Sequence, residues 1–242
     1  MTPQAALSTT TPVSLLRMLD IVVVHQALYA AAALGVADLL MDQPRTTADL
    51  GRQLQVNEGA LYRILRALAG EGIFEETAPR TFANNEVSRF LATGLPGSIR
   101  SILMFKGDAY FFSPFGEILY SIQTGESART KILGMNGFEY LRRNPEVARV
   151  FDEAMTNITQ LSASAIASAY DFGRWGSLME LGGGNGNLLA AILDAHRGLR
   201  GVLADQPHVL SRARGFLNGE LKARSTIVDC DFFSQVPSGC RA

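Results

Sequence analysis

The sequence has few cysteines and no excess of charge of either sign. Only two of its 242 residues are cysteine, Cys230 and Cys240, and the formal net charge is -1. This pair does not have the ligand spacing of a metal site, so we interpret both as free thiols and expect no bound metal. A chain this close to neutral also has no overall basic character that would favour nucleic acid.

The sequence begins without the features of a secretory signal. Its start, MTPQAALSTTTPVS, has neither a basic region nor an apolar stretch. We therefore expect no signal peptide and a cytoplasmic location. Residues 21–40 are apolar enough to suggest a membrane span, but His25, Gln26 and Asp38 interrupt them and would be costly in lipid. A buried or dimer-forming helix is the favoured interpretation.

Length and composition indicate a globular chain of more than one domain. Hydrophobic residues make up 47% and charged residues 19% of 242 residues, which exceeds the usual length of a single domain. We expect a flexible tail at 1–12, a helix-rich domain at 13–95, a helical region at 96–170 and part of an α/β domain at 171–242.

Residues 46–83 have the pattern of a winged helix. Thr46 and Asn57 can each cap a helix, and segments 73–76 and 81–82 predict a short hairpin. Many winged helices bind DNA, but residues 46–94 contain five arginines, no lysine and six acids. Phosphate binding requires a basic face, and Glu58 near the start of the second helix would repel phosphate. DNA binding is therefore the less favoured alternative.

Aromatic side chains are concentrated between residues 96 and 170. They are Phe105, Tyr110, Phe111, Phe112, Phe115, Phe138, Tyr140 and Phe151. Each could belong to a core, and as a group they could line a pocket for a flat aromatic substrate.

A glycine-rich turn lies between a short apolar strand, 177–181, and a helical run, 188–195. Glycines at 182, 184 and 186 allow the backbone to approach a ligand closely at the positive end of a helix. The dinucleotide fingerprint requires glycine at the position of Asn187, so an NAD site fits poorly. A ligand without a pyrophosphate fits better.

Two later segments supply polar groups that could complete a nucleoside site. Asp205 ends the predicted strand 201–204, where its carboxylate could accept hydrogen bonds from ribose hydroxyls or simply cap the next helix. After a third strand, 225–229, Asp231 could accept from an adenine amino group while Phe232 packs on the ring.

The segments MELGGGNGN, ADQPHVL and CDFF resemble the nucleoside-binding segments of the S-adenosylmethionine-dependent O-methyltransferases that include the caffeate and hydroxyindole enzymes. The resemblance implies an α/β, Rossmann-like class I methyltransferase domain preceded by a mostly α winged-helix domain used for homodimerisation. It implies S-adenosyl-L-methionine as cofactor and a hydroxyl of an aromatic small molecule as methyl acceptor, with no nucleic acid and no membrane as partner.

The resemblance also suggests site residues in this sequence. The expected cofactor-binding residues are Gly182, Gly184, Gly186, Asp205, Asp231, Phe232 and Thr159. The expected substrate-binding residues are Phe105, Phe115, Phe151 and Met155.

Several positions depart from the family pattern. Phe115 stands where Trp is more usual, Glu180 replaces an Asp and Gln206 replaces a Leu. From residue 179 onward there is room for about two βα units, whereas a doubly wound sheet has about six strands. Half a sheet would leave the strand 178–181 as an apolar edge.

The family's catalytic histidine would follow the segment present here. The three histidines, His25, His196 and His208, are better explained as structural or surface residues, so we assign no catalytic residue. We expect methyl transfer to be impaired in this chain alone. The alternatives are a catalytically dead homologue that still dimerises and, less favoured, a winged-helix DNA-binding regulator.

Overall fold

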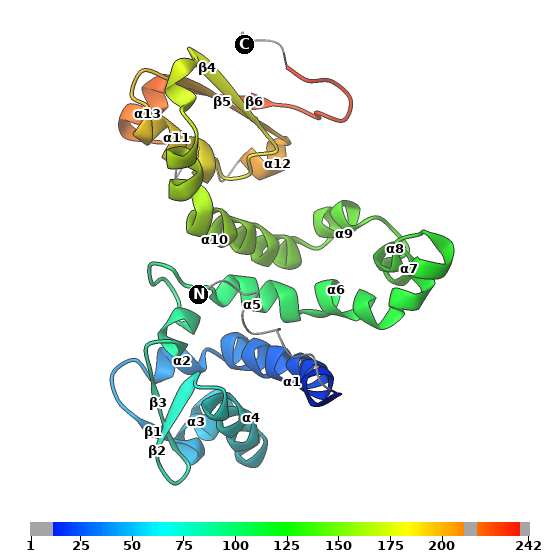
Figure 1. Cartoon of the computed structure of the whole chain (residues 1–242), viewed down its shortest axis with the longest axis vertical. Helices are drawn as coiled ribbons and strands as arrows, with labels where there is room; N and C mark the ends of the chain where they lie inside the picture. Colours follow the sequence, from blue (N-terminus) through cyan, green and yellow to red (C-terminus); the bar gives the residue numbers. More distant parts are fainter. Residues whose placement is uncertain (1–11, 211–216, 238–242) are drawn as a thin grey trace. The chain divides into compact units, whose positions relative to one another are not determined.

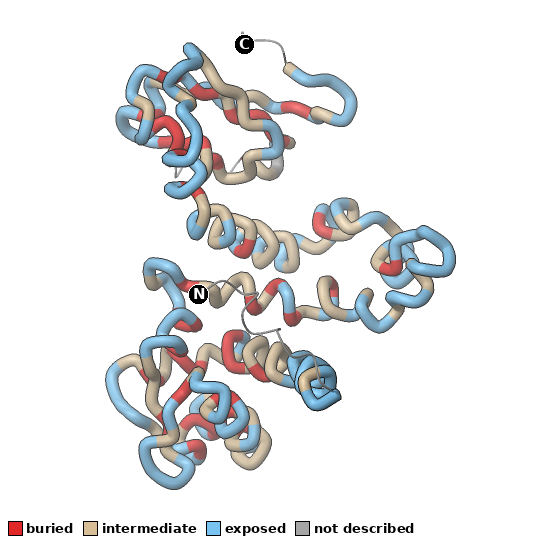
Figure 2. Tube along the Cα trace, in the orientation of Figure 1, coloured by how far each residue is buried: buried red, intermediate tan, exposed pale blue. Residues whose placement is uncertain are grey.

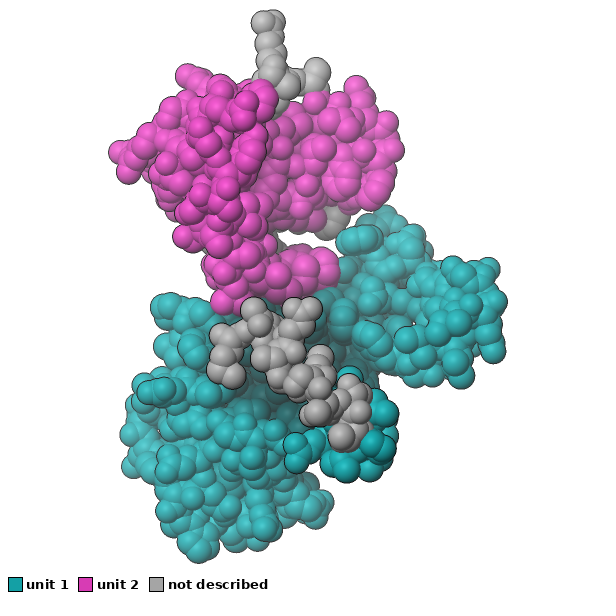
Figure 3. Space-filling view, viewed as in Figure 1, with its two compact units in different colours: residues 1–147 teal, residues 148–242 magenta. Residues whose placement is uncertain are grey.

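The computed structural model describes residues 12–210 and 217–237, and the chain divides into two compact units, residues 1–147 and 148–242 (Figure 1). Buried residues occur in both units (Figure 2), which are drawn in separate colours in Figure 3. The predicted tail lies outside the described residues except for Pro12, as does Cys240. Each unit is described by itself.

The helix expected over the apolar residues 21–40 is present as α1 (Pro12–Leu34), which starts earlier and ends before residue 40. Gly35 ends it with φ +68, a left-handed conformation that glycine adopts without steric cost, and the short α2 (Val36–Leu39) follows. Ala27, Ala31 and Ala32 of α1 are buried. The first half of the helix is largely exposed (Figure 2) and carries the apolar side chains Val13, Leu15, Leu16, Met18, Leu19, Ile21, Val22 and Val23.

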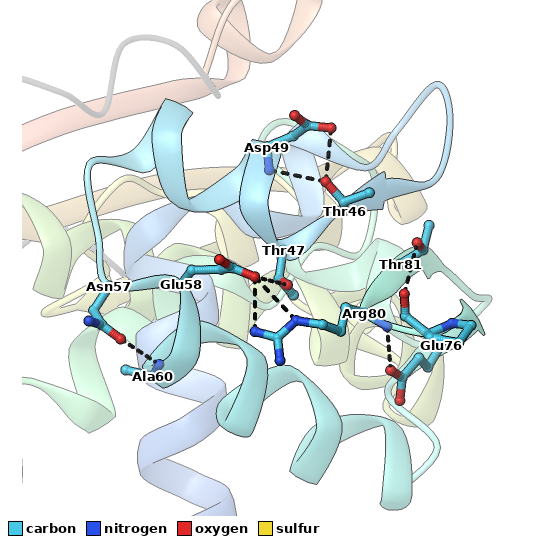
Figure 4. Close-up of polar contacts among 10 residues, drawn as sticks. Thr46, Thr47, Asp49, Asn57, Glu58, Ala60, Glu76, Arg80 and Thr81 are labelled. Carbon is cyan, nitrogen blue, oxygen red and sulfur yellow. Dashed lines mark hydrogen bonds and ion pairs between the residues drawn. The ribbon is translucent and has the colours of Figure 1, made fainter.

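Both predicted caps of the helix-turn-helix are confirmed. Thr46 Oγ1 accepts from Asp49 N at 3.1 Å at the start of α3 (Thr47–Leu54). Asn57 Oδ1 accepts from Ala60 N at 2.9 Å at the start of α4 (Glu58–Gly70), and Figure 4 shows both contacts. Each cap satisfies a backbone N–H that has no partner within its helix.

The predicted hairpin is also confirmed and belongs to a small antiparallel sheet. Its strands are β1 (Arg45–Thr46), β2 (Phe74–Ala78) and β3 (Thr81–Asn84), in the order β1-β3-β2. The core of this unit includes Phe74 and Phe82 of the sheet together with Leu65 and Leu68 of α4, all nearly inaccessible to solvent.

The cation at the hairpin turn is held within the domain. The Glu58 carboxylate accepts from Nη2 of Arg80 at 2.9 Å, from Nε of Arg80 at 3.2 Å and from the hydroxyl of Thr47 at 3.2 Å (Figure 4). The Arg80 guanidinium also lies 4.3 Å from the ring centroid of Tyr62. Glu58 therefore connects the hairpin to the start of α4, and Arg80 already has an acidic partner.

The Glu58–Arg80 contact should stabilise this unit measurably. Both side chains are half-exposed, so we expect Glu58→Gln to lower the free energy of unfolding by only about 1 kcal/mol. Urea unfolding of Glu58→Gln, Arg80→Ala and the double variant would give the coupling energy. Glu86→Gln, which removes an exposed acid from the same unit, should have no effect; a coupling energy of zero would contradict the prediction.

The rest of the first unit is formed by short helical segments. They are η2 (Ser88–Leu91), α5 (Arg100–Gly107), α6 (Ala109–Phe112), η3 (Ser113–Glu117), α7 (Ile118–Thr124), α8 (Ala128–Leu133) and α9 (Gly137–Arg143). Within the helical region expected at 96–170, residues 113–117 form a tighter 3-10 turn, with Pro114 near its beginning, before α7.

The second unit contains a parallel sheet with helices. Its strands are β4 (Ser177–Leu181), β5 (Arg200–Asp205) and β6 (Ser225–Asp229), in the order β4-β5-β6. The helices are α10 (Pro145–Ala169), which begins just before this unit, α11 (Asn187–Ala195), α12 (Pro207–Leu210) and α13 (Gly219–Arg224), with a 3-10 turn, η4 (Phe172–Arg174).

The three predicted strands are thus confirmed, and β4 pairs with β5 alone among the described residues. Leu189 and Leu193 of α11 and Leu203 of β5 are fully buried in one cluster. Because parallel strands place their carboxyl ends at one edge, the residues after β4, β5 and β6 come together there.

Candidate cofactor site

The glycine turn after β4 adopts a backbone that requires glycine. Gly182, Gly184 and Gly186 have φ of +68, +59 and +75, in the region that other residues avoid. A Cβ on Gly186 would lie 2.9 Å from Leu203 Cδ2, whereas a Cβ on Gly184 would meet nothing within 4 Å. Gly186 thus allows the turn to pack on β5, and Gly184 borders open space.

The carboxylate of Asp205 connects the end of β5 to this turn. Its Oδ2 accepts from Gly184 N at 2.8 Å and its Oδ1 from Gln206 N at 2.7 Å. The side chain is largely buried, with the residue 8% exposed. Each oxygen can accept a further hydrogen bond, which is what binding of a pair of ribose hydroxyls requires.

The third segment lies at the same edge. A hollow of about 370 Å³ is lined by Gln206, Pro207, Asp229, Cys230 and Asp231. A Cβ on Gly182 would lie 3.3 Å from Phe232 Cζ, which brings the β6 segment against the start of the glycine turn. The predicted residues Gly182, Asp205, Asp231 and Phe232 therefore gather at one edge of the sheet, while their contacts with a cofactor stay predictions.

The Asp231 side chain also has a local structural role. Its Oδ1 accepts from Phe233 N at 3.2 Å and its Oδ2 from the hydroxyl of Ser234 at 3.0 Å. These contacts hold the turn after β6 and orient the carboxylate. The Cys230 thiol, which is buried, donates to Gln235 O at 3.1 Å and fastens the same turn.

Glu180, which replaces the Asp of the family pattern, is also part of the site. Its Oε2 accepts from the backbone N of Leu189, the third residue of α11, at 3.1 Å. Burial raises the pKa of Glu180 to about 7; the Leu189 N–H opposes this shift, and the nearby Asp205 charge adds to it. The sequence signal that could have identified Glu180 as a site residue is its place as an acid in the strand directly before the glycine turn.

The hydroxyl of α10 that contacts the glycine turn belongs to Thr156. Asn185 Nδ2 donates to Thr156 Oγ1 at 2.6 Å, and Asn187 Nδ2 donates to Thr156 O at 3.4 Å. The predicted residue, Thr159, is half-buried three positions further along α10. Sequence reasoning missed Thr156 because a hydroxyl at either position fits the spacing of a helix.

The four predicted substrate residues are divided between the two units. Phe105 is buried with its ring 5.0 Å from that of Phe111, which lies 5.6 Å from the exposed Phe115. Phe151 and Met155 are half-buried on α10. A shared pocket for these four residues stays a prediction.

The histidines have structural surroundings where they are described. The His25 ring stacks at 5.4 Å on Phe112, and His196 Nε2 lies 3.2 Å from Ala167 O. The side chain of His208 lies outside the described structure. We assign none of the three to catalysis.

Comparison with known families identifies both parts of the chain. Residues 16–94 match the O-methyltransferase dimerisation domain, and residues 116–241 match the O-methyltransferase domain. The chain belongs to the O-methyltransferase family. This confirms the predicted family and fold class, in which a mostly helical dimerisation domain precedes a class I methyltransferase domain with, here, a three-stranded part of the sheet.

Individual family members are similar over most of this chain. It is 37% identical to the phenazine O-methyltransferase PhzM of Lysobacter antibioticus, over 93% of this chain and 66% of that protein. It is 32% identical to the mitomycin biosynthesis 6-O-methyltransferase of Streptomyces lavendulae, over 88% of this chain and 62% of that protein. The chain therefore spans less than two thirds of the length of these curated relatives.

Solved structures agree with the fold. The crystal structure of LaPhzM superposes with a TM-score of 0.87 at 37% identity, covering 95% of this chain and 70% of that one. CalO1, a methyltransferase in calicheamicin biosynthesis, superposes with a TM-score of 0.78 at 29% identity in its form with bound S-adenosylhomocysteine. The superposition covers 98% of this chain and 69% of that one.

The raised pKa of Glu180 predicts a pH-dependent stability. Because the folded-state pKa, about 7, lies above the ordinary value of 4.5, the folded chain binds a proton that the unfolded chain has released. This contribution is fully present below the ordinary pKa and is lost as the pH rises through about 7. We expect about 1 to 3 kcal/mol less stability at about pH 8 than at about pH 5 from this group.

Urea unfolding at the two pH values tests this, with Glu180→Gln expected to remove most of the difference. Glu220→Gln, which changes an exposed acid in the same unit, should leave the difference unchanged. The same pH dependence in Glu180→Gln and in the parent chain would contradict the assignment.

Proposed function

We propose that the chain binds S-adenosylmethionine at the glycine turn and takes part in methyl transfer to a hydroxyl of an aromatic small molecule. The observation that carries the proposal is the buried Asp205 carboxylate bonded to Gly184 N, beside a turn that is open at Gly184. The arrangement fits a nucleoside whose ribose needs an acceptor and whose chain passes close to backbone. Family membership supports the same cofactor.

Each segment has a distinct part in the proposal. Gly182 and Gly184 leave room for the cofactor, Asp205 accepts from its ribose, and Asp231 and Phe232 contact its adenine. When bound, the cofactor supplies an electrophilic methyl group on a sulfonium. Glu180 and Thr156 act at one remove, because they hold α11 and the turn residue Asn185 in position.

The acceptor class is inferred from the family. Relatives include a 3-amino-4-hydroxybenzoate 4-O-methyltransferase and a 2,7-dihydroxy-5-methyl-1-naphthoate 7-O-methyltransferase, at 32% and 31% identity. An 8-amino-8-demethylriboflavin N,N-dimethyltransferase is 35% identical, so an activity screen should contain arylamines as well as phenols. A phenol with a pKa near 10 must lose its proton during attack, and we assign no base for this step to the described residues.

Titration calorimetry with S-adenosylhomocysteine tests the cofactor site. We expect the parent chain to bind and Asp205→Asn to bind at least about ten-fold more weakly, because the amide loses a charged acceptor. Asp194→Asn, a change to an exposed carboxylate on α11, is the matched control and should bind like the parent. A folded parent chain that does not bind, or equal binding by Asp205→Asn, would reject the site.

Transfer assays then separate the leading proposal from the catalytically inactive alternative. Binding of S-adenosylhomocysteine with no transfer to any phenol or arylamine would favour a homologue that keeps the scaffold without the chemistry. Salt-dependent binding of duplex DNA would support the regulator alternative. The pairing of Arg80 with Glu58 argues against this alternative, because it neutralises the cation that a DNA-binding hairpin would present to phosphate.

We further propose that a second copy of the chain covers the exposed half of α1, as the dimerisation-domain match supports. By length and composition alone, this 23-residue helix could also cross a membrane. Leu16 and Leu19 are 61% and 69% exposed, too much apolar surface to leave in water along with their neighbours.

Sedimentation velocity should therefore show a dimer that Leu16→Glu/Leu19→Glu dissociates. Val236→Glu, a change to an exposed apolar residue in the second unit, should remain dimeric. A monomeric parent chain that floats with lipid vesicles would instead assign this face of α1 to a membrane.

A further inference from the structure

Two cationic side chains of the first unit lie at one phenylalanine ring. The guanidinium carbon of Arg129 is 5.6 Å from the ring centroid of Phe111 and 5.0 Å from that of Tyr110. The ammonium of Lys106 is also 5.6 Å from the Phe111 centroid. Two cations beside one ring make the local potential positive, which favours a bound anion.

The acids of this region are already engaged. Glu117 pairs with Lys131 at 2.8 Å, and Glu139 pairs with Arg142 and Arg143. Asp108 accepts from Tyr110 N at 2.8 Å, and Glu126 accepts from the hydroxyl of Tyr120. Among residues 12–210 and 217–237, no acidic side chain forms a salt bridge with Lys106 or Arg129.

Arg129 is also incompletely satisfied. Its Nε is buried and has no hydrogen-bond partner in the described structure. A buried N–H of a charged group is costly to leave unpaired, and such groups are normally bonded to protein, water or ligand. Gly137 allows this placement: a Cβ there would lie 2.8 Å from the Tyr110 hydroxyl and 3.3 Å from Arg129 Cδ.

The two rings beside the guanidinium, Tyr110 and Phe111, belong to a larger group of aromatic side chains. Tyr110 is stacked on Tyr140 at 5.3 Å and donates its hydroxyl to Gly137 O at 3.1 Å. The ring centroid of Phe111 is 5.0 Å from that of Phe105 and 5.6 Å from that of Phe115, two residues that the sequence suggested for substrate binding. A guanidinium whose buried Nε has no partner in the described structure, beside the half-buried ring of Phe111, suits a ligand that is both aromatic and anionic.

We propose that Arg129, assisted by Lys106, binds the carboxylate of an aromatic acid whose ring packs on the half-buried rings of Phe111 and Tyr140. This rests on the proposed function, since it makes the substrate class an aromatic carboxylic acid that carries the acceptor hydroxyl. Arg129 is then a specificity residue for the substrate and takes no part in the proton or methyl transfer.

The test compares a charged probe with its neutral isostere. Binding of 2-naphthoic acid and of 2-naphthamide is measured by titration calorimetry on the full chain. We expect the parent chain to prefer the acid by about ten-fold or more, the usual effect of a charge-assisted hydrogen bond. The affinity of Arg129→Met for the acid should fall by about ten- to one-hundred-fold, and its affinity for the amide should change little, so that the preference for the acid is lost.

Two further variants keep the result interpretable. Arg142→Met, which removes an exposed cation of α9, should retain the parent's preference. If Arg129→Met does not fold, Lys106→Met changes an exposed side chain and should reduce the preference by a smaller factor, about three-fold or more. An equal affinity of the parent chain for acid and amide, or an unchanged preference in both Arg129→Met and Lys106→Met, would overturn the inference.

S-adenosylhomocysteine is titrated into the same samples, so that the two proposals fail separately. Normal binding of S-adenosylhomocysteine without a preference for the acid rejects the carboxylate site and leaves the cofactor site standing. A preference for the acid without binding of S-adenosylhomocysteine supports the carboxylate site and rejects the cofactor proposal.

Discussion

The hydrogen bond from Gly184 N to the Asp205 carboxylate is the contact on which the candidate site depends. It joins the end of β5 to the turn that follows β4, and the turn can reach it because Gly184 adopts φ +59. The backbone bond from Gly182 N to Ala204 O at 2.8 Å continues the sheet pairing up to this point. One carboxylate thus shapes the loop and remains available to a ligand.

Glu180 shows what this arrangement costs. Its carboxylate accepts from Leu189 N at the N-terminal end of α11, yet it is half-buried near a second carboxylate, and both partial burial and that charge favour its neutral form. Asp205 supplies an acceptor to the glycine turn and Glu180 supplies one to the start of α11, and the proximity of the two carboxylates is electrostatically unfavourable. Such conflicts are expected where residues serve a ligand site as well as the fold.

The two units differ in how their helices and strands form a core. In the first, capped helices and a small sheet enclose a leucine and phenylalanine core, while the first half of α1 keeps its apolar side chains exposed. In the second, α11 packs leucines on a parallel sheet, and the polar groups collect where the strands end. Aromatic and cationic side chains of residues 105–140 form a third kind of cluster, in which rings and charges are in contact.

Local chemistry in the sequence determined the elements: Thr46 and Asn57 as caps, Gly35 as a helix end, three strands and the glycine turn, because caps, turns and short strands depend on neighbouring residues. The gathering of Gly182, Asp205 and Phe232 followed from parallel strand order. Only the tertiary structure decided that Thr156 contacts the turn, that the half-buried Glu180 lies near Asp205, and that Lys106 and Arg129 both lie near the Phe111 ring. These depend on the rotation of a helix and on side-chain packing between distant segments, which residue spacing does not specify.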